Sequence, residues 1–239
     1  MLMSEIDEKY LLRFYTALLE AFGDQHWWPS DSPFETIIGA VLAQNVSWTG
    51  AHTAVQSLQK AGLMAPDALY KTEVATIASH IRSSRYYNQK AERIRTFLKW
   101  FITEYGGNIQ NMGEVPAHTL RVQMLSLKGL GPETVDSILL YALDKPVFVV
   151  DAYTRRIGHR QGWFSDDEQY AKMQDFFMKR LDPDPGLFND FHAQIVRLGN
   201  QICKTKPLCS NCPVRMVPDS PPCSYWEQQE GTGIEVHHE

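Results

Sequence analysis

Long apolar runs and strand-like alternation are both missing from this chain. No run of eighteen apolar residues occurs in its 239 residues, which excludes a membrane-spanning helix. The opening residues Met-Leu-Met-Ser-Glu-Ile-Asp-Glu-Lys lack the basic start and apolar core of a signal peptide, so we expect a cytoplasmic protein. No stretch alternates apolar and polar residues for long enough to build a sheet, and no internal repeat is present.

An excess of positive charge is also missing. The chain has 23 Lys and Arg residues against 28 Asp and Glu residues, for a formal net charge of -5. A protein that binds nucleic acid by charge alone is strongly basic. The composition therefore argues against that class, unless the cations gather on one face of the folded protein.

What is present is helical periodicity, and it predicts an all-α protein. The length suits one sizeable domain or two small ones, and 44% hydrophobic content is ordinary for a globular protein. Apolar residues recur at helical spacing on two early faces, Leu11 to Phe22 and Phe34 to Leu42. Further helices are expected at 73–82, 88–104, 117–125, 132–143, 152–161, 167–181 and 188–203.

The first 202 residues contain no cysteine, whereas four follow in the last sixth of the chain. Their spacing is C-x5-C-x2-C-x10-C, and a disulfide framework is not expected in a cytoplasmic protein. Four thiolates in a compact loop suit a tetrahedral zinc ion or a [4Fe-4S] cluster, and the spacing alone leaves the two level. The candidate ligands are Cys203, Cys209, Cys212 and Cys223.

A glycine turn between two predicted helices is the first candidate binding motif. Gly129 and Gly131 can adopt backbone angles that side chains forbid, and Pro132 suits the first position of a helix. The amides of such a turn can grip the phosphate backbone of a nucleic acid without reading bases. The alternative is an ordinary helix-helix turn. The residues concerned are Lys128, Gly129, Gly131, Glu133 and Thr134.

Asp151 is the candidate catalytic residue. It follows the apolar run Pro146–Val150, twenty residues past the second hairpin glycine, and precedes a predicted helix. A lone carboxylate can stabilise positive charge on a sugar or orient water onto it. Most aspartates in front of a helix are instead N-caps, and the residues alone favour that interpretation.

The hairpin, the loop and Asp151 together resemble the signature of the HhH-GPD DNA glycosylase superfamily, which includes endonuclease III. The resemblance covers nearly the whole chain up to residue 226 and implies an all-α, two-domain helix-hairpin-helix fold. It places a six-helix domain at 25–146 and a cluster domain at 1–24 plus 147–226. It also implies that Asp151 is catalytic and that double-stranded DNA with damaged bases is the partner of a monomeric, nucleoid-associated enzyme. The polar composition of residues 227–239 predicts a disordered tail.

The resemblance favours a [4Fe-4S] cluster over zinc. Relatives of endonuclease III commonly space their cluster ligands C-x6-C-x2-C-x5-C. Here the first gap is one residue shorter and the last is five longer. Cys223 is therefore the ligand whose position departs most from the family spacing.

Two aromatic segments resemble the 3-methyladenine DNA glycosylase III branch of the superfamily. By that resemblance Trp28, Pro29 and Trp48 sandwich the flipped base, and Gln44 fills the gap that the nucleotide leaves. Tyr86, before Tyr87-Asn88, is the candidate wedge into the duplex. The plain alternatives are core tryptophans and a polar residue at a helix end.

The resemblance also points to an absent residue. Bifunctional relatives carry a nucleophilic lysine two residues past the second hairpin glycine, where this chain has Glu133. A carboxylate cannot form a Schiff base with the sugar. We therefore expect a monofunctional glycosylase that excises an alkylated, 3-methyladenine-like purine and leaves an abasic site. An endonuclease III-like glycosylase for oxidised or mismatched bases, or a non-catalytic lesion-binding protein, are the alternatives.

Overall fold

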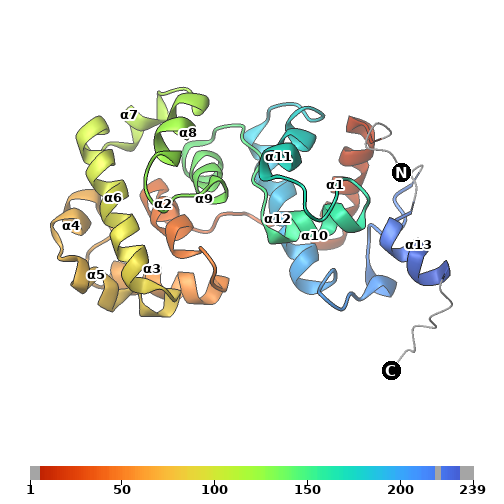
Figure 1. The fold of residues 1–239 in the computed structure, drawn as a ribbon, viewed down its shortest axis with the longest axis horizontal. Helices are drawn as coiled ribbons and strands as arrows, with labels where there is room; N and C mark the ends of the chain where they lie inside the picture. Colours follow the sequence, from red (N-terminus) through yellow and green to blue (C-terminus); the bar gives the residue numbers. More distant parts are fainter. Residues whose placement is uncertain (1–5, 219–221, 232–239) are drawn as a thin grey trace. The chain divides into compact units, whose positions relative to one another are not determined.

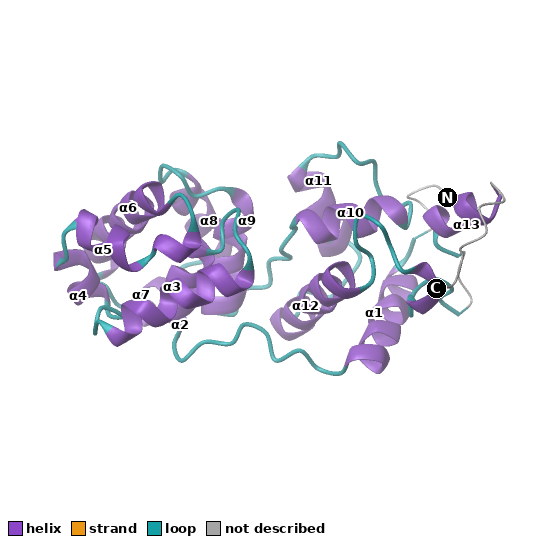
Figure 2. Ribbon diagram, turned by 90° about the horizontal axis from the view of Figure 1, so that it is seen from below, coloured by secondary structure: helices purple, strands orange, loops and turns teal. Residues whose placement is uncertain are grey.

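A computed structural model describes residues 6–218 and 222–231 (Figure 1). Within these ranges every regular element is a helix and no strand is present (Figure 2), which confirms the all-α prediction. None of the helices described is long and apolar enough to cross a membrane. The helices are α1 (Glu8–Phe22), α2 (Pro33–Leu42), α3 (Trp48–Lys60), α4 (Pro66–Lys71), α5 (Val74–His80), α6 (Tyr87–Tyr105), α7 (Ile109–Gly113), α8 (Ala117–Leu125), α9 (Pro132–Ser137), α10 (Ala152–Arg160), α11 (Tyr170–Met178), α12 (Pro185–Gln201) and α13 (Ser224–Gly231).

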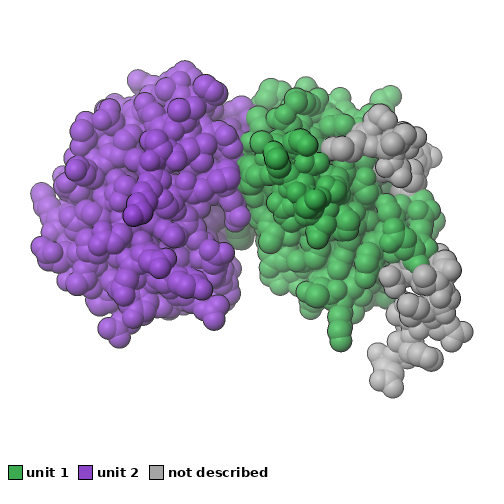
Figure 3. All heavy atoms as spheres, viewed as in Figure 1, with its two compact units in different colours: residues 1–27, 148–239 green, residues 28–147 purple. Residues whose placement is uncertain are grey.

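The chain divides into two compact units (Figure 3). One comprises Trp28–Val147, and the other comprises Met1–Trp27 together with Phe148–Glu239. Short helical turns complete them: η2 (Arg82–Ser84) and the π-helical η3 (Ile138–Ala142) in the first, and η4 (Cys209–Asn211) in the second. Of the segment expected to be a disordered tail, residues 227–231 are helical in α13, and residues 232–239 lie outside the described ranges.

Helix α2 is the buried centre of the 28–147 unit. Every residue from Phe34 to Leu42 is buried, and the helix packs against α3, α6, α9 and η3. The helix begins where the amide of Glu35 donates to Ser32 Oγ at 3.2 Å, with Pro33 in its first turn. Because α2 has no polar face to leave in water, its enclosure fixes the position of both of its ends.

Lys90 of α6 holds the carboxyl end of α2. Its side chain is completely buried, and Nζ donates to the carbonyl of Leu42 at 2.8 Å and to that of Ser84. Burial, with a smaller contribution from the charge of Arg93, lowers the pKa of Lys90 to about 8. The ammonium caps carbonyls that no helix bond satisfies, and it ties the end of α2 to the loop before α6.

A buried ion pair joins α8 to α9 on either side of the glycine turn. Arg121 donates from Nε to Asp136 Oδ1 at 2.7 Å and from the guanidinium to Oδ2 at 3.0 Å. Asp136 is completely buried. Two parallel bonds fix relative orientation as well as distance, so the two helices hold the intervening turn in one conformation.

The core of the other unit is aromatic. Trp163 is completely buried, with its ring centroid 4.8 Å from that of Phe14 and 5.6 Å from that of Phe176. Phe148, where the chain enters this unit, stacks on Phe177 at 3.9 Å with an interplanar angle of 8°. The segment that leads to Asp151 is therefore anchored in the core just before that residue.

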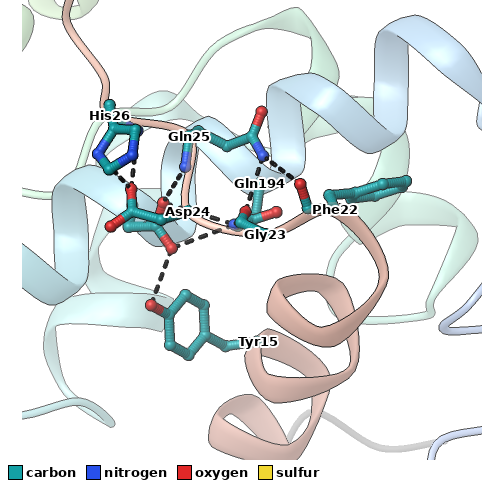
Figure 4. Close-up of polar contacts among 8 residues, drawn as sticks. Tyr15, Phe22, Gly23, Asp24, Gln25, His26 and Gln194 are labelled. Atoms are coloured by element: carbon teal, nitrogen blue, oxygen red, sulfur yellow. Dashed lines mark hydrogen bonds and ion pairs between the residues drawn. The ribbon is translucent and has the colours of Figure 1, made fainter.

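Polar contacts join the end of α1 to α12 (Figure 4). Tyr15 Oη donates to Asp190 Oδ2 at 2.8 Å, and the amide of Gln25 donates to Oδ1 at 3.2 Å. Gln194 Nε2 donates to the carbonyl of Gly23 at 2.7 Å. These bonds satisfy the backbone where α1 ends and join residues about 170 positions apart in the chain.

Candidate functional site

Trp28 and Trp48 lie side by side in the 28–147 unit. Their ring centroids are 4.9 Å apart with an interplanar angle of 79°, so one ring presents its edge to the face of the other. Trp28 also lies 5.4 Å from the ring of Tyr141, and it packs so closely on Gly39 that a Cβ there would be 3.3 Å from the indole. Glycine at position 39 therefore makes room for Trp28 on the surface of α2.

A small cavity lies beside the two indoles. Its volume is about 10 Å³, which is enough for about one water molecule and far too little for a purine. The structure thus brings the three predicted pocket residues together, with the rings perpendicular rather than parallel. The cavity is lined by Trp28, Pro29, Glu35, Gly39, Trp48, Ala51, His52 and Val55.

Gln44 is docked on the glycine hairpin. Its Nε2 donates to the carbonyl of Gly129 at 3.2 Å and to Thr134 Oγ1 at 2.8 Å. Its Oε1 accepts a hydrogen bond from the guanidinium of Arg93 in α6. All three bonds orient the side-chain amide, so Gln44 connects the end of α2 with the hairpin and with α6.

Arg93 is a residue that the sequence did not indicate. Gly129 has φ +93°, and a Cβ there would lie 2.7 Å from Cγ and Nε of Arg93. Glycine at position 129 is thus required both by the backbone angle and by the close approach of the arginine. Only the fold places Arg93 beside Gly129, because these two residues are more than thirty positions apart in the chain.

The rest of the hairpin is mostly exposed. The exposed residues of the turn are Lys128, Gly129, Gly131 and Glu133. Leu130, between the two glycines, is instead buried, with 5% of its surface exposed. Gly131 occupies the N-cap of α9 and has no side chain to bond the first amides of the helix. The turn consequently presents its backbone and one lysine to solvent.

Tyr86 stands out from the surface of the same unit. Its side chain is 62% exposed, and both Arg85 and Tyr86 have positive φ, at 56° and 41°. Such angles are strained for residues with side chains and occur where the surrounding structure imposes them. Here Lys90 binds the carbonyl of Ser84 from beneath, which helps to hold the loop.

In the other unit, Asp151 is the N-cap of α10. Its Oδ1 accepts hydrogen bonds from the amide of Thr154 at 2.7 Å and from Thr154 Oγ1 at 2.9 Å. His192 Nε2 of α12 lies 3.8 Å from the same oxygen. Among the described residues no hydrogen bond is made to Oδ2, and the side chain keeps 14% of its surface exposed. Oδ1 therefore caps the helix, and Oδ2 takes no part in the cap.

The pKa of Asp151 lies below the ordinary value of an aspartate. Burial acts to raise this pKa, but His192 and then the two hydrogen bonds from Thr154 act more strongly in the opposite direction. The environment thus favours the ionised carboxylate although the group is largely removed from water. His192 is a second residue that the sequence did not indicate, because it lies 41 positions away on a helix whose buried face is mostly apolar.

The four cysteines lie in one neighbourhood without forming a recognised metal site. None is in a disulfide, and each is partly buried. Within the described ranges no group of three or more His, Cys, Asp or Glu side chains is arranged to hold a metal ion. Burial raises the pKa of the Cys212 thiol to about 12, and the charges of the other three cysteines add to that rise. Thiols close enough to affect one another in this way are a donor set of the kind that a cluster requires.

Two arginines of α10 organise the loop that carries these thiols. Arg156 donates to the carbonyls of Gly199 and Cys203 at 2.9 and 2.8 Å. Arg160 donates to Cys203 Sγ at 3.2 Å, and its guanidinium stacks on the ring of Tyr225 at 4.6 Å. These contacts hold the chain around Cys203 against α10.

Comparisons with known proteins agree with this architecture. The family model of the HhH-GPD superfamily base excision DNA repair proteins matches residues 38–183. A candidate DNA repair glycosylase of Methanocaldococcus jannaschii is 36% identical over 215 residues, which cover 89% of this chain and 97% of that protein. Endonuclease III of Thermotoga maritima is 29% identical over 181 residues, which cover 75% of this chain and 79% of the relative.

Two solved structures are similar over most of the chain. H. pylori 3-methyladenine DNA glycosylase bound to 1,N6-ethenoadenine matches with a TM-score of 0.69 at 26% identity, covering 82% of this chain and 98% of that one. A trapped covalent intermediate of endonuclease III with DNA matches with a TM-score of 0.78 at 20% identity, covering 94% and 99%. The second match is a likeness of fold.

The first prediction concerns His192. Replacing it with Gln should raise the pKa of Asp151, because the strongest of the effects that lower this pKa is removed. A carboxyl with a lowered pKa stabilises the fold above its ordinary pKa of about 3.9 and loses that contribution as the pH falls through the folded-state value. The variant should therefore be less stable than wild type near neutral pH and approach it in acid.

NMR titration of the Asp151 carboxyl carbon and chemical denaturation at several pH values provide the measurement. His159→Gln on the exposed face of α10 is the control and should change neither quantity. An unchanged Asp151 titration in His192→Gln would contradict the assigned role of His192.

Proposed function

Because the chain belongs to the HhH-GPD superfamily of base excision DNA repair glycosylases, we propose that it excises an alkylated, 3-methyladenine-like purine and leaves an abasic site. The observation that carries this proposal is the pair of indoles, Trp28 and Trp48, beside a cavity. Electron-rich indole faces attract a cationic base more strongly than a neutral one. The similarity to a glycosylase named for 3-methyladenine, which was solved with an adenine derivative, supports the same class of substrate.

Excision of an N-alkylated purine requires no catalytic side chain other than Asp151. An N-alkylated purine already carries a positive charge and leaves readily, so no strong general acid is needed. Positive charge then builds on the sugar, and an ionised carboxylate can stabilise it or orient the attacking water. Asp151 has the required lowered pKa and an oxygen, Oδ2, outside the N-cap bonds.

The DNA would be held by the hairpin, by Gln44 and by Tyr86. Exposed amides near Gly129 and Gly131, with Lys128 beside them, suit phosphate oxygens. Tyr86, exposed and held on a strained loop, suits insertion between bases. Gln44 would leave its bonds with the hairpin to fill the space of the flipped nucleotide.

We further propose that Cys203, Cys209, Cys212 and Cys223 hold a [4Fe-4S] cluster. When bound, the cluster would cross-link the carboxy-terminal loop and contribute stability rather than chemistry on the base. Arg156 and Arg160 already fold this loop through its carbonyls. Lys204 and Lys206 would then be presented to the DNA backbone on a rigid surface.

A second candidate function has an observation in its favour. Trp28 and Trp48 pack edge to face as core residues do, and the cavity beside them is small. If these rings do not separate, the base would need another pocket. A glycosylase for oxidised or mismatched bases, in the manner of endonuclease III, would then be the better assignment.

The second prediction tests both the substrate and the missing lysine. A labelled duplex that carries one 3-methyladenine should break only after hot alkali, because Glu133 stands where a Schiff-base lysine would be needed. Gel electrophoresis before and after alkali gives the result. Breaks without alkali would show that another residue forms the Schiff base and cleaves the strand. No break in either sample would show that 3-methyladenine is not the substrate and that the enzyme acts on another lesion.

The third prediction concerns Asp151. Asp151→Asn should lower the rate of base release by at least about a hundredfold and leave the affinity for lesion-containing DNA nearly unchanged. Asparagine is as good an N-cap as aspartate, so α10 should remain intact. Single-turnover excision and fluorescence anisotropy are the two measurements.

The matched control is Asp184→Asn. Asp184 is the N-cap of α12 in the same unit and also accepts bonds from backbone amides. This variant should retain full activity. Equal losses of binding and excision in Asp151→Asn would contradict a catalytic role for Asp151.

The fourth prediction concerns the cluster. Protein purified without oxygen should be brown and contain iron and acid-labile sulfide in equal amounts. Cys223→Ser should lower both, since this thiol is one of the four proposed ligands. Metal analysis and visible absorption make the measurement; a colourless protein with one zinc per chain would contradict the proposal.

A further inference from the structure

Glu35 is a buried acidic residue that lines the aromatic cavity. It is 7% exposed and lines the same space as Trp28, Trp48 and His52. The other residues that line this cavity are apolar, apart from the imidazole of His52. A carboxylate in a buried and largely apolar site is costly unless something compensates its charge.

Only neutral donors reach this carboxylate. Oε2 accepts hydrogen bonds from Gln59 Nε2 at 2.8 Å and from the amide of Asp31 at 3.2 Å. In the part of the chain that the structure describes, no Lys or Arg forms an ion pair with Glu35, and no hydrogen bond is made to Oε1.

The charges nearby do not neutralise it either. Asp31 also accepts from Gln59 Nε2, at 3.4 Å, so a second acid shares the side-chain donor of Glu35. His52 faces the cavity from α3, where its ring stacks on Trp48 at 6.2 Å. The cavity is therefore lined by two indoles and by Glu35, whose Oε1 accepts no hydrogen bond from the described residues.

We propose that Glu35 is the specificity-determining residue that makes this pocket select a positively charged base. The inference rests on the proposed function and deepens it, because it names the charge of the base as the quantity that the pocket recognises. Indole faces attract a cation weakly, and a buried carboxylate of opposite charge adds a stronger and more selective attraction. When the indoles part to admit a base, Oε1 provides the counter-charge.

The capping role of Glu35 does not explain this arrangement by itself. Glu35 is three residues past the N-cap Ser32, which is the position of the acid in a capping box. Glutamine serves as well at that position, because only an oxygen acceptor is required. A carboxylate is needed only where charge matters, so the two roles can be separated by Glu35→Gln.

The fifth prediction is tested by equilibrium binding and by excision. Isothermal titration with two small probes, the 3,9-dimethyladeninium cation and neutral 9-methyladenine, measures the pocket without any reaction. Glu35→Gln should weaken binding of the cation by about tenfold or more and change that of the neutral probe by less than about twofold. Excision of 3-methyladenine from a duplex should fall by a similar factor.

Further measurements distinguish a loss of charge selectivity from a loss of folding and from a failure of the proposed function. Glu92→Gln on the exposed surface of α6 is the matched control and should match wild type in every measurement. Thermal unfolding of Glu35→Gln should equal that of wild type, since the cap is retained. Equal weakening of both probes, or no change with the cation, would overturn the inference. Selective binding of the cation by a wild-type protein that excises no alkylated base would support Glu35 and refute the proposed function.

Discussion

One buried ammonium holds together the parts of the 28–147 unit that are proposed to meet DNA. Lys90 binds the carbonyl of Leu42, just before Gln44, and the carbonyl of Ser84, just before the exposed Tyr86. Its pKa of about 8 reflects the cost of burying the charge, which the two carbonyls partly offset. Gln44, the proposed gap-filling residue, and Tyr86, the proposed wedge, therefore each lie two residues after a carbonyl that Lys90 binds.

Asp151 and Glu35 share one feature, which is that the two oxygens of each carboxylate differ in their hydrogen bonds. In each, one oxygen accepts bonds that organise the start of a helix or the chain before it, and the other has no hydrogen bond among the described residues. Asp151 faces a histidine that lowers its pKa, whereas Glu35 faces indoles and neutral donors. A carboxylate already fixed by the fold needs no reorganisation when a ligand arrives, which is the condition for strong electrostatic stabilisation.

The small volume of the aromatic cavity sets the main constraint on the proposed function. Trp28 against Trp48 leaves space for about one water, so a base enters only if an indole moves. Gly39 lets Trp28 lie directly on the fully buried α2, which cannot yield.

The sequence by itself determined the helical class, most helix positions, the glycine turn and the cluster of cysteines, because these depend on local spacing and on backbone angles. It did not indicate the short helices α4 and α7, whose few residues carry too little periodicity. Only the tertiary structure decided that Arg93 orients Gln44, that His192 lies beside Asp151 and that Glu35 lines the cavity. Each of these contacts joins residues that are distant in the chain or on faces that spacing cannot orient, and only packing of the helices brings such groups within hydrogen-bonding or electrostatic range.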